Sequence, residues 1–144
     1  IHLNDLGEPE LVHISLDRAS LASQSVGPPL SDVEMSAAGR SWVKLGKKML
    51  SLEPLANQAV HPNDSVLGPL AVAGGNGLAT TYADMVRAAF KDEWWNSSAV
   101  VDADFHVIPD LNVTVGGPLL TTDQFTVIEA NFSLFWGLAV LSYE

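Results

Sequence analysis

A chain of 144 residues, 47% of them hydrophobic and only 17% charged, is long enough to bury a core of its own and too apolar to be disordered. Its net charge of −10 argues against a nucleic-acid-binding protein, because phosphate groups are bound by Lys and Arg. The absence of cysteine excludes disulfide bonds, Cys-ligated zinc, iron–sulfur clusters and a thiol nucleophile. We therefore expect a single domain over residues 1–144.

The N-terminal region carries few signals of regular structure. Residues 1–10, IHLNDLGEPE, are expected to form an extended arm. Residues 11–15 predict a short strand. Residues 22–31 predict a loop, because Gly27-Pro28-Pro29 favours an extended path.

A first amphipathic helix is predicted to begin at Ser31 and to end before Pro54. Ser31 and Glu34 have the spacing of a capping box, in which the serine side chain accepts a hydrogen bond from the third helical amide. Apolar residues then recur at intervals of three and four, as on one face of a helix: Met35, Ala38, Trp42, Leu45, Met49 and Leu52.

A second amphipathic helix is predicted from residue 79 or 80 to Trp94. The segment before it, residues 53–77, is rich in Pro and Gly and predicts loops, with one short strand over residues 66–72. Six apolar residues would line one face of this second helix: Leu78, Tyr82, Met85, Val86, Ala89 and Phe90.

The C-terminal third changes to the alternating pattern of β-strands. It predicts strands over residues 101–107 and 111–115, and one long strand or two over residues 124–143, with a kink at Gly137. We therefore expect an α+β fold, with two amphipathic helices in the N-terminal two-thirds packed on a mainly antiparallel sheet formed largely by the C-terminal third.

Asp102, Asp104 and His106 are the candidate metal-ligating or acid–base residues. On a strand these side chains point the same way, about 7 Å apart for neighbours and about 13 Å apart for the outer two. One ion that binds its ligands at about 2.0–2.6 Å cannot reach all three from a flat strand. The pattern therefore favours the solvent face of a strand, with at most a weak divalent-cation site and no other cofactor.

Other catalytic motifs are absent from the sequence. The remaining histidines, His2, His13 and His61, have no zinc-binding spacing, and Gly-x-Ser-x-Gly does not occur. The glycine-rich residues 73–82 match neither nucleotide-binding pattern. No catalytic residue is identified, so an enzyme is not the expected class, although a triad built from distant residues stays open.

Four Asn-x-Ser/Thr sequons suggest an extracellular or surface-exposed protein, because chance alone would supply about one. The chain begins Ile-His-Leu with no leader pattern, so we expect either that a signal segment has already been removed or that the sequence is a piece of a longer protein. No apolar run reaches the roughly 18 residues of a membrane-spanning helix. The candidate glycosylation sites are Asn63, Asn96, Asn112 and Asn131.

Three classes of function remain open. The first is a non-enzymatic structural or assembly subunit of an extracellular or particle-surface complex. It would self-associate through apolar surface and an N-terminal arm, as a homo-oligomer or with other protein subunits. The alternative is a glycan- or protein-binding module that uses the aromatic rings of Trp94 and Trp95, although packing is the more common role of such a pair. The second alternative is a metal-dependent hydrolase that uses Asp102, Asp104 and His106.

Overall fold

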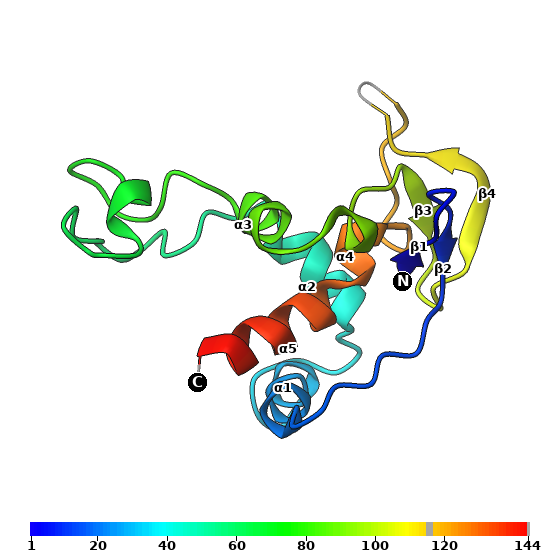
Figure 1. Ribbon diagram of the computed structural model, residues 1–144, viewed down its shortest axis with the longest axis horizontal. Helices are drawn as coiled ribbons and strands as arrows, with labels where there is room; N and C mark the ends of the chain where they lie inside the picture. The colour runs from blue at the N-terminus through cyan, green and yellow to red at the C-terminus, as the bar shows by residue number, and fades with distance from the viewer. Residues whose placement is uncertain (115–116, 144) are drawn as a thin grey trace. The chain divides into compact units, whose positions relative to one another are not determined.

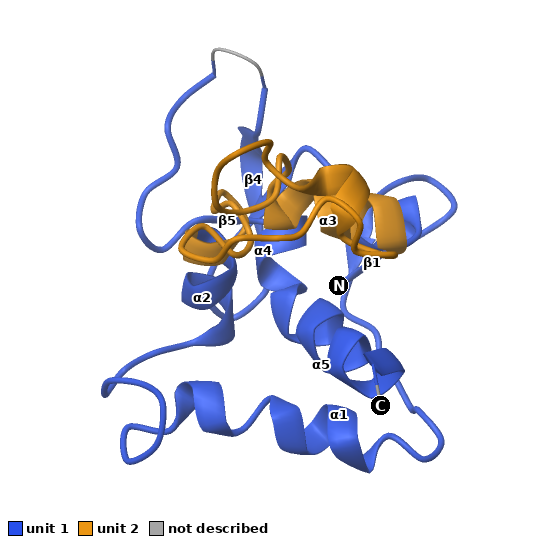
Figure 2. Cartoon of the chain, turned by 90° about the vertical axis from the view of Figure 1, so that its left-hand side faces the viewer, with its two compact units in different colours: residues 1–47, 90–144 blue, residues 48–89 orange. Residues whose placement is uncertain are grey.

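The computed structural model describes residues 1–114 and 117–143. In this part of the chain there are five α-helices, three 3-10 helices and two small antiparallel sheets, which confirms the α+β class (Figure 1). The chain divides into two compact units (Figure 2). Unit 1 combines residues 1–47 with residues 90–144, and unit 2 is the continuous segment 48–89.

The first ten residues of unit 1, predicted as an extended arm, form a small hairpin. Strands β1 (His2–Leu3) and β2 (Pro9–Glu10) pair antiparallel, with His2 opposite Glu10 and Leu3 opposite Pro9. The side-chain oxygen of Asn4 accepts hydrogen bonds from the backbone amides of residues 6 and 8, and Gly7 closes the turn with a φ of 77°. The hairpin therefore holds its shape through local bonds.

The predicted strand over residues 11–15 is absent, and helices replace the loop predicted over residues 22–31. Helix α1 (Ser20–Ser25) is followed by the 3-10 helix η1 (Pro28–Leu30). The indole nitrogen of Trp136 donates to the carbonyl of Ser25, and that of Trp42 donates to the carbonyl of Val26. These two bonds satisfy carbonyls at the C-terminal end of α1, which a helix cannot pair internally.

The first predicted long helix is wrong in its first half. Residues 31–41 form turns, and helix α2 covers only Trp42–Met49. Gly39 has a φ of 77°, in the left-handed region, which interrupts a helix. Met35 and Ala38 of the predicted apolar face are exposed, so this face has no packing partner in the described chain before Trp42.

Unit 2 contains one 3-10 helix, η2 (Gly68–Leu70), and helix α3 (Tyr82–Ala89). Helix α3 confirms the second predicted helix, although it is shorter, and its Val86 is buried as predicted. The strand predicted over residues 66–72 is reduced to a single bridge between Ala71 and Leu78. The buried positions of this unit are few: Leu50, Pro54, Gly77, Leu78 and Val86.

The larger sheet lies in unit 1 and has the order β4-β3-β5. Its strands are β3 (Ala99–Val101), β4 (Val107–Asn112) and β5 (Phe125–Thr126), and a 3-10 helix, η3 (Asp92–Trp94), precedes them. The central strand β3 pairs antiparallel with both neighbours, and its Val100 and Val101 are fully buried. The strand predicted over residues 101–107 is wrong, because the chain turns there; residue 115 of the second predicted strand lies outside the described residues.

The final predicted strand is also wrong, because the chain after β5 is helical. Helix α4 (Val127–Ala130) leads into helix α5 (Phe132–Tyr143). The Thr126 hydroxyl accepts from the amide of Glu129, while the Glu129 carboxylate accepts from the amide of Thr126, which makes a complete capping box. Gly137 of α5 lets α1 approach closely, since a Cβ there would lie 3.3 Å from the carbonyl oxygen of Ala22.

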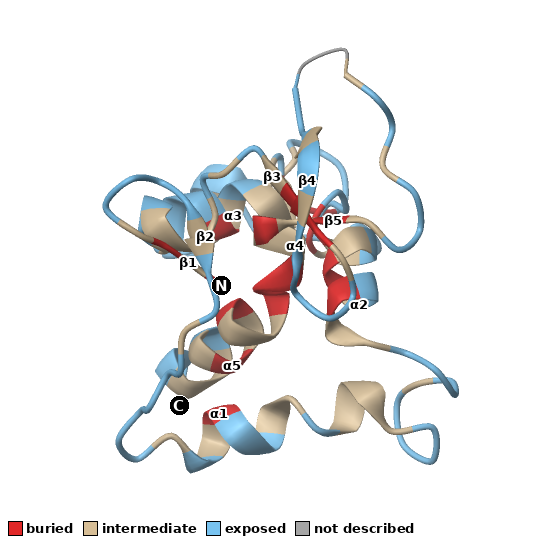
Figure 3. Ribbon diagram, turned by 90° about the vertical axis from the view of Figure 1, so that its right-hand side faces the viewer, coloured by how far each residue is buried: buried red, intermediate tan, exposed pale blue. Residues whose placement is uncertain are grey.

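The core of unit 1 gathers at the meeting of β3, β5, α4 and the first turns of α5 (Figure 3). Its buried side chains include Val43, Val101, Phe125, Val127 and Phe135. The core therefore depends on the C-terminal helices as much as on the sheet.

No helix in the described part of the chain is both long enough and apolar enough to cross a membrane.

Candidate functional site

Asp102, Asp104 and His106 lie on the tight connection between β3 and β4. One carboxylate oxygen of Asp102 accepts hydrogen bonds from the backbone amides of Asp104 and His106, both at 2.9 Å. Its second oxygen lies 3.3 Å from Nδ1 of the His106 ring. Phe105 takes a φ of 67°, which turns the chain back toward β4.

This turn brings the three side chains much closer than strand geometry predicts. One ligand atom from each residue lies within 4.8 Å of the others, whereas a flat strand would separate the outer two by about 13 Å. The prediction of a solvent-facing row is wrong, because the row requires an extended backbone at residues 102–106. The residues are solvent-accessible all the same, with Asp104 and His106 exposed.

The electrostatics of this turn centre on Asp102. The hydrogen bond from the backbone amide of His106 is the largest cause that lowers the pKa of Asp102 below its usual value, and loss of solvation, the second-largest influence, acts in the opposite direction. The carboxylate is thus already used to hold the turn. Two carboxylates offer at most four of the six to eight oxygen ligands that calcium takes, and the imidazole offers a nitrogen instead of an oxygen.

Trp94 and Trp95 are packed into unit 1. The Trp94 ring contacts the His2 ring edge-on, with 4.7 Å between the ring centres. The indole nitrogen of Trp95 donates to the carbonyl of Phe90 at 3.0 Å. Both rings are half-buried, and these contacts orient them against their own unit. In this geometry Trp94 and Trp95 pack within unit 1, and packing is one of the two interpretations of this pair that the sequence offers.

Asn131 has a structural role that its sequon does not reveal. Its side chain is buried, and its Oδ1 accepts from the backbone nitrogen of Ile1 at 2.7 Å. Its Nδ2 donates to the carbonyls of Ile1 at 2.6 Å and of Trp94 at 2.7 Å. One amide thus ties β1, η3 and the junction of α4 and α5 together.

The four sequon asparagines differ sharply in exposure. Asn63, Asn96 and Asn112 are exposed, whereas Asn131 is only 5% exposed. A glycan is attached to the side-chain nitrogen of asparagine, and in Asn131 that nitrogen makes the two hydrogen bonds described above. The structure therefore separates three accessible candidate sites from one inaccessible one.

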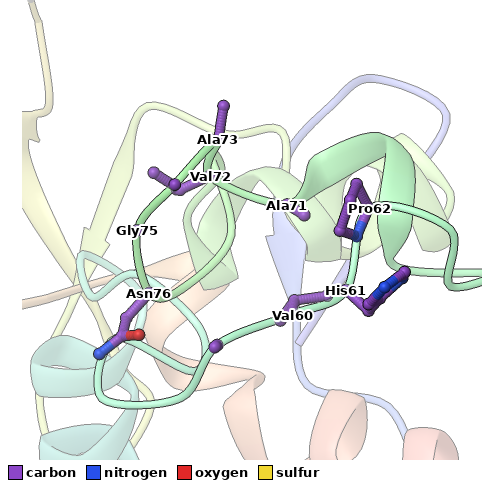
Figure 4. A pocket seen from close by; sticks show the side chains of 10 residues that line it. Val60, His61, Pro62, Ala71, Val72, Ala73, Gly75 and Asn76 are labelled. Carbon is purple, nitrogen blue, oxygen red and sulfur yellow. The ribbon is translucent and has the colours of Figure 1, made fainter.

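A hollow of about 610 Å³ lies within unit 2, between the segments around His61 and around Gly75 (Figure 4). Its lining is mostly small and apolar, and the polar side chains in it are those of His61 and Asn76. Nδ1 of His61 accepts from the backbone amide of Asn63, which leaves the ring part of a local turn. The glycine-rich segment forms one wall of an open hollow, and no Lys or Arg of the described chain lines it.

Large apolar side chains are exposed at several places on the described chain. The most exposed of them are Leu119 at 96%, Tyr143 at 89%, Val33 at 88% and Leu6 at 84%. The sequence predicts more apolar surface than one chain can bury, and it predicts a final strand as the place of this surface. The structure puts part of it on helix α5 instead, and the Thr126-x-x-Glu129 capping signature could have revealed that helix.

Comparison of the chain with protein-family models, with curated proteins and with solved structures found no match. The function is therefore argued from the chain's own residues.

Proposed function

We propose that this protein is a non-enzymatic structural or assembly subunit of an extracellular or particle-surface complex, and that it self-associates through apolar surface. The observation that carries the proposal is helix α5. Its sequence, FSLFWGLAVLSY, is apolar on all sides, with only two serines among twelve residues.

A helix that is apolar all round is normally surrounded by other protein or by lipid. In α5 the fully buried residues are Phe132, Phe135 and Gly137, all in its first half. Ala139, Ser142 and Tyr143 in its second half are exposed, and Val140 and Leu141 are only partly covered. Helix α1 covers one side of α5, so the remaining apolar surface fits contact with another protein chain.

The net charge of the protein is consistent with a specific contact between copies rather than with non-specific association. A net charge of −10 keeps copies apart unless a complementary surface brings them together. The three exposed sequon asparagines support the extracellular part of the proposal, because glycans require accessible surface.

The test is the oligomeric state of the protein, measured by native mass spectrometry and analytical ultracentrifugation over a wide range of concentrations. We expect a multimer that the Ala139→Glu variant weakens, because this variant places a charge on the exposed apolar side of α5. Ala88→Glu is the matched control, since Ala88 is an exposed alanine on α3. A protein that is monomeric at every concentration would remove the proposal.

A further inference from the structure

Residues 12–16, between β2 and α1, have backbone groups without hydrogen-bonding partners in the described chain. Residues 12–16 make no hydrogen bond to any other part of the described chain. Figure 1 shows the segment as a single trace that runs from the N-terminal hairpin to α1. Leu11 is 73% exposed, Leu16 44% and Ile14 37%. Unpaired backbone groups beside exposed apolar side chains are typical of a strand that pairs with another chain.

The sequence of this segment suits a strand. Val12, Ile14 and Leu16 alternate with His13 and Ser15, so an extended backbone would place the three aliphatic side chains on one face. The segment contains no Gly, no Pro and no acidic residue, and β-branched residues favour strands. The sequence therefore predicts a strand here, and the folded chain supplies no partner for it.

We propose that this segment pairs antiparallel with the same segment of a second copy, about a two-fold axis at Ile14. This inference rests on the proposed self-association and names the surface that carries it. With Ile14 opposite itself, Val12 lies opposite the second copy's Leu16, and the apolar residues of both copies meet on one face.

The charged residues at the two ends of the segment favour this register over the neighbouring ones. Centring the pair on Ile14 places Glu10 opposite the second copy's Arg18, twice by symmetry, so opposite charges face each other at both ends. Shifting the centre to a point between His13 and Ile14 would place Glu10 opposite Asp17, which is repulsive. Centring on His13 would place Glu10 opposite Leu16. Arg18 has a φ of 55°, so the strand ends there and the charged pair closes it.

The surroundings of Ile14 leave room for the second copy. A hollow of about 420 Å³ lies beside Ile14 and Leu16, and Ala19, Ser20, Ala22 and Ser23 form its other wall. In the pairing about Ile14, the second copy's Ile14 and Val12 face Ile14 and Leu16 and therefore lie next to this hollow. Their side chains would bury apolar surface that an isolated copy leaves open to water.

Disulfide trapping tests the register directly, because the protein has no cysteine of its own. In the variant Ile14→Cys the two introduced thiols would face each other, within the short separation that a disulfide requires. We expect rapid covalent dimer formation under mild oxidation. The single variants His13→Cys and Ser15→Cys are the matched controls and should cross-link far more slowly, while a mixture of the two should cross-link with each other.

A charge-reversal series supplies a second readout that needs no cross-link. Glu10→Arg or Arg18→Glu alone should weaken the dimer about tenfold, since each turns two attractive pairs into repulsive ones. The double variant should restore the affinity. The dissociation constants are measured by analytical ultracentrifugation.

The outcomes separate this inference from the proposed function. The pairing is overturned if the protein is a multimer but Ile14→Cys cross-links no faster than the two controls. It is also overturned if the double variant dimerises as weakly as the single charge variants. Either result leaves self-association through another surface, such as α5. Cross-linking of Ile14→Cys to a cysteine placed on β4 instead would identify that edge strand as the partner and would also overturn the pairing. A monomer at every concentration removes both proposals.

Discussion

The side chain of Asn131 forms hydrogen bonds with both the backbone nitrogen and the carbonyl of Ile1, although 130 positions separate the two residues. The backbone nitrogen of Ile1 donates to Oδ1 of Asn131, and the carbonyl of Ile1 accepts from Nδ2. The same nitrogen of Asn131 reaches the carbonyl of Trp94. A buried amide that satisfies three backbone groups stabilises the fold mainly because each group would otherwise be buried without a partner.

Asn131→Ala should destabilise the protein by about 3 kcal/mol, because it leaves these three backbone groups unpaired. Asn96→Ala is the control, since Asn96 is an exposed sequon asparagine and its side chain makes no hydrogen bond within the described chain. The free energy of unfolding is measured with urea on unglycosylated protein from bacteria. Equal stability of the two variants would contradict the role assigned to Asn131.

Expression through a eukaryotic secretory pathway should give glycans on Asn63, Asn96 and Asn112, and none on Asn131 of the folded protein. The reason is that the nitrogen of Asn131 is buried and hydrogen-bonded. Enzymatic deglycosylation in heavy-oxygen water, followed by peptide mass spectrometry, marks each occupied site. A glycan on Asn131 in protein that still has native stability would show that the prediction is wrong.

Gly46→Ala should destabilise unit 1 by about 1–2 kcal/mol, even though alanine favours helices. A Cβ at this position would lie 2.5 Å from the carbonyl oxygen of Glu129 and 2.7 Å from Cβ of Phe132. Overpacking against backbone costs about 1–3 kcal/mol, and the gain in helix propensity, about 1 kcal/mol, offsets only part of it.

Gly137→Ala is the matched comparison for Gly46, because its Cβ would come no closer than 3.3 Å to any neighbour. The contact requires a shift of only a few tenths of an ångström, so this variant should destabilise the protein less than Gly46→Ala in the same urea measurement. If the two variants change the free energy of unfolding equally, the close approach of α2 to α4 and α5 is not the cause.

Asp102 should make stability depend on pH in the acidic range. The amide of His106 lowers the pKa of Asp102 in the folded state, so its ionised form stabilises the fold above the unfolded pKa of about 4, and this contribution is lost as the pH falls through the folded pKa. The melting temperature of the protein should therefore exceed that of Asp102→Asn at neutral pH, and the difference should shrink at lower pH. Asp104→Asn is the control, since the carboxylate of Asp104 accepts no hydrogen bond in the described part of the chain. A difference that grows toward acid would contradict this account.

Two capping signatures in the sequence show which part of the fold was predictable. Ser31-x-x-Glu34 and Thr126-x-x-Glu129 have the same pattern, and only the second begins a helix. After Thr126, Val127 is fully buried, whereas Val33 after Ser31 is 88% exposed. A cap contributes about 1 kcal/mol, which is too little to hold a helix that has no surface to pack against. The sequence shows the cap but does not show the packing.

The periodicity of the chain was informative only where one face is polar. Helix α3 has such a face and was predicted, while α5 is apolar on all sides and gives no period that separates a helix from a buried strand. At Asp102 the alternating pattern concealed a turn, because an aspartate that caps its own turn looks like the polar position of a strand. The proximity of Asp102 and His106 therefore could not be predicted from strand spacing.

The tie between Ile1 and Asn131 also sets an order of events during synthesis. Unit 1 is assembled from two separate segments, so its core cannot close until the ribosome has released residues well beyond 131. Residues 48–89, in contrast, are contiguous, so their contacts with one another can form as soon as they emerge. Residues 12–16 leave the ribosome early and are exposed to neighbouring nascent chains until the core of unit 1 has closed.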